Sequence, residues 1–335
     1  MTPMTLSLPS VVELNDPQLA AALRHKIERK TVPHGALGRL AALAERLGLI
    51  LGTTEPRLVA PQLVVCAADH GIAARGVSAY PSDVTWQMVG NFLAGGAAVS
   101  VLARQHGIAQ TVVDCGVRKD FAPAPGLVIR KIASGTQDSS VGPAMSAAQC
   151  EQAVQNGIEL VRGLPGNALL LGEMGIGNTS AASLLAARLG GIDVAEVTGA
   201  GTGLDAAGIA RKTAVLRQAL AALGGFEIAT LVGCVLQAAS QRRVVVVDGF
   251  IASSAVLVAC RMAPPVMQRC VFAHRSDERG HALLLQLLGA EPLLDLALRV
   301  GEGSGAVLAW PILESACRIL NEMASFESAG VSDKA

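Results

Sequence analysis

Five apolar runs in this chain each end in ionisable residues that are followed closely by small or turn-forming residues. These terminal residues are Asp69 with His70, Asp114, Glu173, Asp248 and His274. A continuous apolar run that stops at a charged residue is typical of a buried parallel strand, because helices cover both faces of such a sheet. Open α/β sheets bind their ligands at the carboxyl edge of the strands. The pattern therefore predicts both a parallel sheet and the edge at which a site would lie.

Between residues 62 and 273 these runs alternate with helical segments rich in alanine and leucine, such as 181–189 and 209–223. Such alternation predicts an α/β fold with a doubly wound, mostly parallel, Rossmann-like sheet. Helical patterns occupy both ends of the chain, and after residue 280 they cover 281–288, 292–298 and an apolar stripe that reaches residue 323. We therefore expect a small helical subdomain formed by both termini. The expected boundaries are N-terminal helices in 1–55, an α/β core in 56–285, C-terminal helices in 286–326 and a disordered tail in 327–335.

The composition limits the possible partners. Only 16% of the 335 residues are charged and the mean hydropathy is +0.45, whereas a soluble domain usually has about 25% charged residues. This excess of apolar residues predicts a further buried surface, and we expect a homodimer. A net charge of zero and an aromatic content of 3% argue against nucleic-acid binding, which relies on basic and stacking surfaces.

The sequence also indicates the compartment. The first 18 residues show no basic segment followed by an apolar one, so we expect no secretory signal. The uncharged stretch 84–103 is long enough to span a bilayer, but it contains polar residues and three glycines; we expect a buried helix and no membrane. Seven scattered cysteines are typical of free thiols in a reducing cytoplasm.

Histidine spacing gives little support for a metal site. His274 and His281 are two helical turns apart, so a shared metal and a pair of buried or capping histidines are the alternatives. We favour the second alternative and expect neither a metal nor another cofactor.

The segment 169–189 holds the clearest candidate site. Its loop and helix start contain Gly172, Gly175, Gly177, Asn178, Thr179 and Ser180. Glycines let the backbone approach an anion, and a helix N-terminus offers free N–H groups and a positive dipole end. The segment lacks the Gly-Lys-Ser/Thr ending of a P-loop, so a monophosphate suits it better than a triphosphate. An ordinary capped turn is the alternative, but the Glu173 carboxylate beside it favours a functional site.

A second glycine run contains Gly201, Gly203 and Ala206. As a dinucleotide fingerprint it is weak, because no carboxylate follows at a strand tip about twenty residues later. Lys212, further along the following segment, is either a point charge for a phosphate or a solvated surface lysine. On spacing alone the solvated surface lysine is favoured.

A third run places Glu302 between two glycines just before a helical pattern. Its neighbours Val300 and Val307 make an apolar setting, which raises a carboxyl pKa toward the value that suits a general base. Asp248 at its strand tip either binds ribose hydroxyls or caps a helix, and the sequence does not decide between these.

The chain resembles the nicotinate-nucleotide:dimethylbenzimidazole phosphoribosyltransferase family from residue 35 to about residue 323. The segments that carry the resemblance, in the order of the family, are ADHGIAARGVSAYP, VTWQMVGNFLAGGAAVSVLA, GEMGIGNTSAAS, GTGLDAAG with its lysine, VVVVDGFIASSA, AHRSDERGH and LRVGEGSGAVLAWPIL. The resemblance implies transfer of phosphoribose from nicotinate mononucleotide to 5,6-dimethylbenzimidazole. The products would be α-ribazole 5′-phosphate, inverted at C1′, and nicotinate, in cobalamin biosynthesis.

With the resemblance, each candidate residue receives an expected role, and Glu302 is the expected general base. The expected phosphate and nucleotide contacts are Gly175, Ile176, Gly177, Asn178, Thr179, Ser180, Gly201, Thr202, Gly203, Lys212, Asp248 and Gly249. The expected base contacts are Asp69, His70, Tyr80, Gln87, Met88, Glu173, Met174 and Val300.

Two departures from the family bear on the accepted base. Tyr80 stands where the better-known members have a small serine, and Met88 where a glutamine is often found, with Gln87 one position earlier. Purines or phenolic bases therefore remain candidates beside dimethylbenzimidazole. The rival functions are an NAD(P)-dependent oxidoreductase that uses the second glycine run, and a non-catalytic nucleotide-binding protein that has no need of Glu302.

Overall fold

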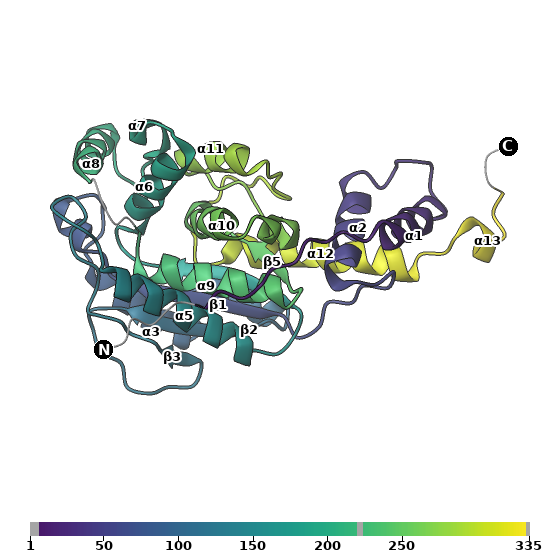
Figure 1. The fold of residues 1–335 in the computed structure, drawn as a ribbon, viewed down its shortest axis with the longest axis horizontal. Helices are drawn as coiled ribbons and strands as arrows, with labels where there is room; N and C mark the ends of the chain where they lie inside the picture. The colour runs from purple at the N-terminus through teal and green to yellow at the C-terminus, as the bar shows by residue number, and fades with distance from the viewer. Residues whose placement is uncertain (1–6, 220–223, 333–335) are drawn as a thin grey trace.

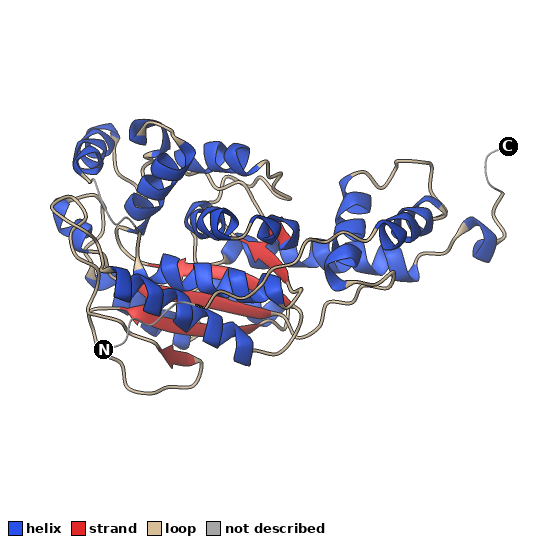
Figure 2. Cartoon of the chain, viewed as in Figure 1, coloured by secondary structure: helices blue, strands red, loops and turns tan. Residues whose placement is uncertain are grey.

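The computed structural model describes residues 7–219 and 224–332. A parallel six-stranded sheet lies at its centre (Figure 2). The strands are β1 (Gln62–Ala68), β2 (Ala109–Gly116), β3 (Leu127–Ile129), β4 (Ala168–Met174), β5 (Val244–Val247) and β6 (Cys270–Phe272). Their order in the sheet is β3-β2-β1-β4-β5-β6 and every pairing is parallel. The predicted α/β fold is confirmed, and the order reverses between β1 and β4, where doubly wound sheets bind their ligands.

Helices cover both faces of the sheet (Figure 1). One face, with Val64 and Cys66 of β1, packs against α5 (Ala147–Gly163), α9 (Phe226–Ser240) and α10 (Phe250–Met262). The other face, with Leu63 and Val65, packs against α3 (Asp83–Leu93), α4 (Ala98–Gln105) and α12 (Ser304–Glu322). The remaining elements are α1 (Pro17–Glu28), α2 (Arg39–Leu51), η1 (Gly71–Arg75), α6 (Asn178–Gly190), α7 (Val194–Val197), α8 (Ala206–Gln218), η2 (Pro264–Arg269), α11 (Arg279–Leu288) and α13 (Phe326–Ala329).

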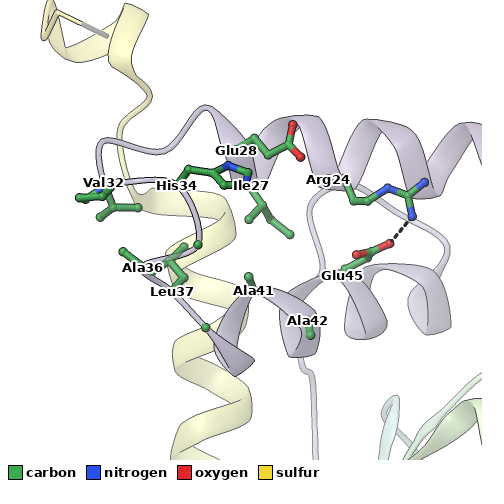
Figure 3. A pocket seen from close by; sticks show the side chains of 13 residues that line it. Arg24, Ile27, Glu28, Val32, His34, Ala36, Leu37, Ala41, Ala42 and Glu45 are labelled. Atoms are coloured by element: carbon green, nitrogen blue, oxygen red, sulfur yellow. Dashed lines mark hydrogen bonds and ion pairs between the residues drawn. The ribbon is translucent and has the colours of Figure 1, made fainter. Parts of the chain in front are cut away.

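Helices from the N-terminal and C-terminal parts of the chain, namely α1, α2, α13 and the distal half of α12, form a helical extension that lies to one side of the sheet in Figure 1. Leu23 and Leu47 are buried between its helices. The Lys30 backbone forms a bridge with Ser325, which joins the segment after α1 to the segment after α12. Figure 3 shows a pocket of about 290 Å³ between α1, α2 and the loop 32–38, with the Arg24–Glu45 ion pair (3.0 Å) at its margin.

Two helix predictions were wrong, one because the segment pairs with the backbone at the edge of β6 and the other because a glycine turn divides it. Residues 292–298 are not helical: Leu293 N donates to the Phe272 carbonyl at 3.0 Å and Leu294 N to the Ala273 carbonyl at 2.9 Å, so the segment runs along the edge of β6. The stretch 84–103 is two helices, α3 of 11 residues and α4 of 8, separated at Gly95 with φ +74°. By length and composition 83–105 would suit a membrane span, but each helix is shorter than the about 20 residues that a span requires.

The expected disorder after residue 326 is also wrong in part. Residues Phe326–Ala329 form α13, because Ser325 and Ser328 cap it reciprocally and Arg29 pairs with Glu327. The predicted helix 209–223 corresponds to α8, and its last four residues lie outside the described part of the chain. The short edge strand β3 was not predicted.

The close packing of α5 against α9 depends on two glycines. A Cβ at Gly157 would lie 2.0 Å from the Thr230 carbonyl oxygen, and one at Gly233 would lie 1.9 Å from the Val154 carbonyl oxygen. Only glycine lets the two backbones approach this closely.

We therefore expect Gly157→Ala to destabilise the protein by about 3 kcal/mol, because overpacking forces the helices apart. Urea denaturation followed by circular dichroism measures the shift of the midpoint. Gly163→Ala is the matched control, because a Cβ there meets nothing within 4 Å at the end of the same helix. Equal midpoints for the two variants would contradict this account.

Candidate active site

A cavity of about 370 Å³ opens beyond the carboxyl ends of β4, β5 and β6. Among the predicted site residues, those that line it are Tyr80, Met88, Glu173, Met174, Gly175, Ile176, Asn178, Thr179, Gly201, Thr202, Gly249, Val300 and Glu302. The structure thus brings together the three glycine runs that the sequence singled out.

The other predicted residues do not line this cavity. They are Asp69, His70, Gln87, Gly177, Ser180, Gly203, Lys212 and Asp248. Most of them lie behind its wall, whereas Gln87 is exposed on α3 and adjoins Met88, which does line the cavity. Successive helix residues point about 100° apart, which explains why one of the pair lines the cavity and the other does not.

The turn from Gly175 to Gly177 fits tightly against the tip of β1. A Cβ at Gly175 would lie 2.5 Å from the Ala68 carbonyl oxygen, and Gly177 adopts φ +98° at the start of α6. The Ile176 N–H donates to Thr85 Oγ1 at 3.1 Å, which ties the turn to α3. No side chain of the described residues caps α6. Asn178 N and Ser180 N donate within the turn, each at 3.0 Å, to the carbonyls of Gly175 and Gly177. What the uncapped helix start offers an anion is therefore chiefly its positive dipole end.

Lys212 is fully buried beside this turn, so the interpretation as a solvated surface lysine is wrong. Its Nζ donates to Thr179 Oγ1 at 2.9 Å and to the Gly199 carbonyl at 3.4 Å. Burial lowers the pKa of Lys212 to about 8, and the Glu278 carboxylate opposes this effect. Lys212 is therefore largely charged at neutral pH and adds a cation to the anion site.

Glu302 lies at the top of a turn with three consecutive left-handed residues. The φ angles of Gly301, Glu302 and Gly303 are +75°, +66° and +96°, and this conformation strains a residue with a side chain by about 1–2 kcal/mol. The backbone of Glu302 rests on β4, since a Cβ at Gly172 would lie 2.2 Å from the Glu302 carbonyl oxygen. Strain of this kind persists only where the surroundings hold it.

Asp248 accepts two hydrogen bonds that help to fix this turn. Its Oδ2 accepts from Gly303 N at 3.1 Å and its Oδ1 from Ala306 N at 2.9 Å. Asp248 at the tip of β5 therefore caps α12, one of the two roles that the sequence left open. Its contact with a nucleotide stays a prediction.

Two carboxyl groups in the cavity hold their protons at unusually high pH. Burial raises the pKa of Glu302 to about 7, with a further increase from the charge of Asp248. Burial raises the pKa of Glu173 to about 8, and Asp248 and Glu227 add to this, although the Asn178 amide donates to the Glu173 carboxylate. At neutral pH Glu173 is thus largely protonated, and Glu302 is close to its midpoint, which suits proton exchange.

Asp69 and His70 are buried behind the wall of the cavity. His70 Nε2 lies 2.7 Å from Glu227 Oε1, and both side chains are buried. Asp69 Oδ2 accepts from Arg118 N at 2.8 Å. A Cβ at Gly175 would lie 3.3 Å from the His70 ring, so this ring supports the anion-binding turn. The predicted contacts of Asp69 and His70 with a base stay untested.

The remaining wall of the cavity is mostly apolar. Met88 and Val84 of α3 line it together with Met174 and Val300. The Thr202 hydroxyl lies 2.8 Å from Ser78 Oγ and accepts from Ala79 N at 3.0 Å, which ties the second glycine run to the loop that carries Tyr80. An apolar wall with a few fixed polar groups is typical of sites for flat aromatic ligands.

His281 has no free nitrogen for a metal. Its Nδ1 accepts from Ser276 N at 2.8 Å, and its Nε2 lies 3.1 Å from Ser253 Oγ. Burial lowers the pKa of His281 to about 3, so the ring is neutral. Within residues 7–219 and 224–332 no group of three or more His, Cys, Asp or Glu side chains is arranged to hold a metal ion.

Sequence reasoning assigned no role to several residues that line the cavity. These are Val84, Phe250, Ile251, His274, Ser276, Glu278, Arg299 and Gly301. His274, Ser276 and Glu278 follow the tip of β6, so their position at a strand end was the available signal. Arg299 gave no signal apart from its closeness to Glu302 in the sequence.

The protonated state of Glu173 makes stability depend on pH. In the unfolded chain its pKa is about 4.3, so folding raises it, and the stability that is present at low pH is lost as the pH rises toward about 8. We expect Glu173→Gln to flatten the decline of the urea midpoint between pH 5 and pH 8.5. Glu159→Gln, at an exposed position in α5, is the control. Identical slopes for wild type and Glu173→Gln would contradict the assignment.

Comparison with known proteins places the chain in a family. A family model described as phosphoribosyltransferase matches residues 12–331. The nicotinate-nucleotide–dimethylbenzimidazole phosphoribosyltransferase of Variovorax paradoxus is 67% identical over 347 residues, which cover 100% of this chain and 99% of that protein. The enzyme of the same name from Dechloromonas aromatica is 54% identical over 96% of this chain and 98% of its own.

A solved structure agrees with these sequences. The crystal structure of CobT from Thermus thermophilus superposes with a TM-score of 0.92 at 41% identity, covering 95% of this chain and 100% of that one. With the cavity, the anion-binding turn and the Glu302 turn in place, the chain belongs to the nicotinate-nucleotide–dimethylbenzimidazole phosphoribosyltransferase family.

Proposed function

We propose that this protein transfers the phosphoribosyl group of nicotinate mononucleotide to 5,6-dimethylbenzimidazole or a related aromatic base. The products are α-ribazole 5′-phosphate and nicotinate, for cobalamin biosynthesis. One observation carries the proposal: a carboxyl group with a pKa of about 7, Glu302, lines the same cavity as the anion-binding turn. The names and near-complete coverage of the relatives support it.

The 5′-phosphate binds at the turn between Gly175 and Thr179. There the N-terminus of α6 and the Lys212 ammonium supply positive charge, and Thr179 is held by Lys212. The aromatic base lies against the apolar wall near Met88 and Val300. Tyr80, which is 55% exposed at the margin of the cavity, contributes to the choice of base.

The chemistry requires one base. The bond between C1′ and the pyridinium nitrogen breaks, and its electron pair returns to that nitrogen, so nicotinate leaves without needing a proton. A ring nitrogen of the incoming base forms a bond to C1′ from the opposite face, which inverts this carbon. The base thereby becomes positively charged, and its other nitrogen loses a proton to Glu302. Glu173, protonated at neutral pH, is able to donate a hydrogen bond within the same cavity.

The rival oxidoreductase function finds no support at the second glycine run. The loop of Gly201 and Gly203 follows helix α7 and not a strand. Asp205 caps the next helix, with its Oδ1 accepting from Gly208 N at 2.7 Å. The strand–turn–helix context of a dinucleotide fingerprint is absent from this part of the described chain.

A homodimer and a cytoplasmic location complete the proposal. The low share of charged residues supports the dimer, and the seven free cysteines support a reducing compartment. Light scattering after size-exclusion chromatography gives the mass of the assembly.

The direct test is incubation of the protein with nicotinate mononucleotide and dimethylbenzimidazole, followed by chromatography of nicotinate and the ribazole product. We expect Glu302→Gln to lower turnover by about 10²–10⁴, the usual contribution of general base catalysis, while the affinity for nicotinate mononucleotide is retained. Glu322→Gln, at the exposed far end of α12, should keep full turnover. Near-normal turnover in Glu302→Gln would remove Glu302 as the base and leave a role in binding alone.

The turnover should depend on pH through Glu302. The base acts when deprotonated, so single-turnover rates rise with pH through a midpoint near the pKa of about 7. Asp248→Asn removes a negative charge that raises the pKa of Glu302, and the midpoint should therefore move to lower pH. Asp295→Asn, a change at an exposed carboxylate, should leave the midpoint in place. An unchanged midpoint in Asp248→Asn would contradict the electrostatic role of Asp248.

A further inference from the structure

Glu278 is a buried carboxylate that the proposed reaction does not use. It lines the cavity and is 8% exposed. It occupies the N-cap position of α11, where a short oxygen-bearing side chain is favoured, yet its side chain makes no capping hydrogen bond. A negative charge in a cavity built to hold a phosphate opposes ligand binding, so its presence needs a physical reason.

The carboxylate of Glu278 packs against the loop that also receives Lys212. A Cβ at Gly199 would lie 2.4 Å from Glu278 Oε2, so a glycine at this position lets the carboxylate reach the loop. The carbonyl of the same Gly199 accepts from Lys212 Nζ. Oε2 has no hydrogen-bond partner among the described residues. The carboxylate and the ammonium thus lie on the same short piece of backbone.

Of the groups described around Lys212, Glu278 is the one that carries a negative charge. Thr179 of α6 and the Gly199 carbonyl are neutral acceptors, and Gly201 carries no side chain. Burial lowers the pKa of Lys212, and Glu278 is the charged residue that raises it. Burial raises the pKa of Glu278, and Asp277 adds to this, whereas Lys212, Arg299 and the Gly201 backbone N–H favour its ionised form.

We propose that Glu278 is a positioning residue of the phosphate site, whose carboxylate holds Lys212 in its ammonium form beside Thr179. The site then presents a fixed positive charge to the 5′-phosphate of nicotinate mononucleotide. This inference rests on the proposed function, because it takes that phosphate as the group that Lys212 meets. Without the carboxylate, a lysine that is completely buried loses its proton near neutral pH and no longer attracts the phosphate.

The test is the affinity of full-length Glu278→Gln for nicotinate mononucleotide, measured by isothermal titration calorimetry between pH 6 and pH 8.5. The dissociation constant of the variant is divided by that of the wild type at each pH, so that titration of the phosphate itself cancels. We expect this ratio to rise with pH and to be about tenfold larger at pH 8 than at pH 6, since a tenfold change corresponds to one pH unit in the titration of a single group. Glu196→Gln, at an exposed position in α7, should give a ratio of one throughout.

An arginine at position 212 separates this role from a structural one. A guanidinium stays protonated without a counter-charge. The dissociation constant of the double variant, Glu278→Gln with Lys212→Arg, is therefore divided by that of Lys212→Arg alone, and this ratio should stay near one at every pH. Glu278→Asp, which retains the charge, should also keep a ratio that does not vary with pH. If Glu278→Gln does not fold, two comparisons still test the inference. They are Glu278→Asp with the wild type, and the double variant with Lys212→Arg.

Three results would overturn the inference. A ratio that is raised equally at every pH would mean that Glu278 shapes the loop or contacts the sugar. A loss that persists in the arginine background would have the same meaning. If the wild type itself binds no nicotinate mononucleotide, the proposed function and the role of Glu278 both fail, whereas normal wild-type binding with a ratio that does not vary with pH removes only the role of Glu278.

Discussion

The capping of α12 by Asp248 is the contact on which the geometry of the site depends. It joins the tip of β5 to the start of a helix from the C-terminal part of the chain, and both of its hydrogen bonds end beside Glu302. The same charge raises the pKa of Glu302 and Glu173. One carboxylate therefore fixes the position of the expected base and raises its pKa, an effect that a neutral cap would not have.

The two ends of the cavity differ in their charged groups. The end near Lys212 has a cation and the N-terminus of α6, both suited to a phosphate. The end near Glu302 has raised carboxyl pKa values and apolar walls, suited to an aromatic base that becomes positively charged when it bonds to C1′ and then loses a proton. The first end follows the tip of β4, and the Glu302 turn is held by Asp248 at the tip of β5, so the two ends belong to neighbouring strands of one sheet.

Much of the fold was readable from the sequence because buried parallel strands leave a strong local pattern. The five apolar runs that end in ionisable residues are strands, and the edge at which they end carries the cavity. The short strand β3 at the sheet edge has too few residues for such a pattern, and 292–298 follows the edge of β6 although its local spacing suits a helix. The glycine turns and Glu302 were found because each is a local motif. The burial of Lys212, the double use of Asp248 and the presence of Glu278 depend on contacts between distant segments, which spacing does not reveal.

Helix α12 has a mechanical consequence for the enzyme. Its 19 residues span about 28 Å at 1.5 Å per residue, from the strained turn at Glu302 to the helical extension, where it packs against α2. Pro311 lies inside this helix and has no N–H to donate to the preceding turn, so the helix has a built-in point of bending between the cavity and the extension. The Glu302 turn therefore relies for its orientation on the nearby contacts with Asp248 and β4, and a load on the distant end of the helix is partly taken up at the proline.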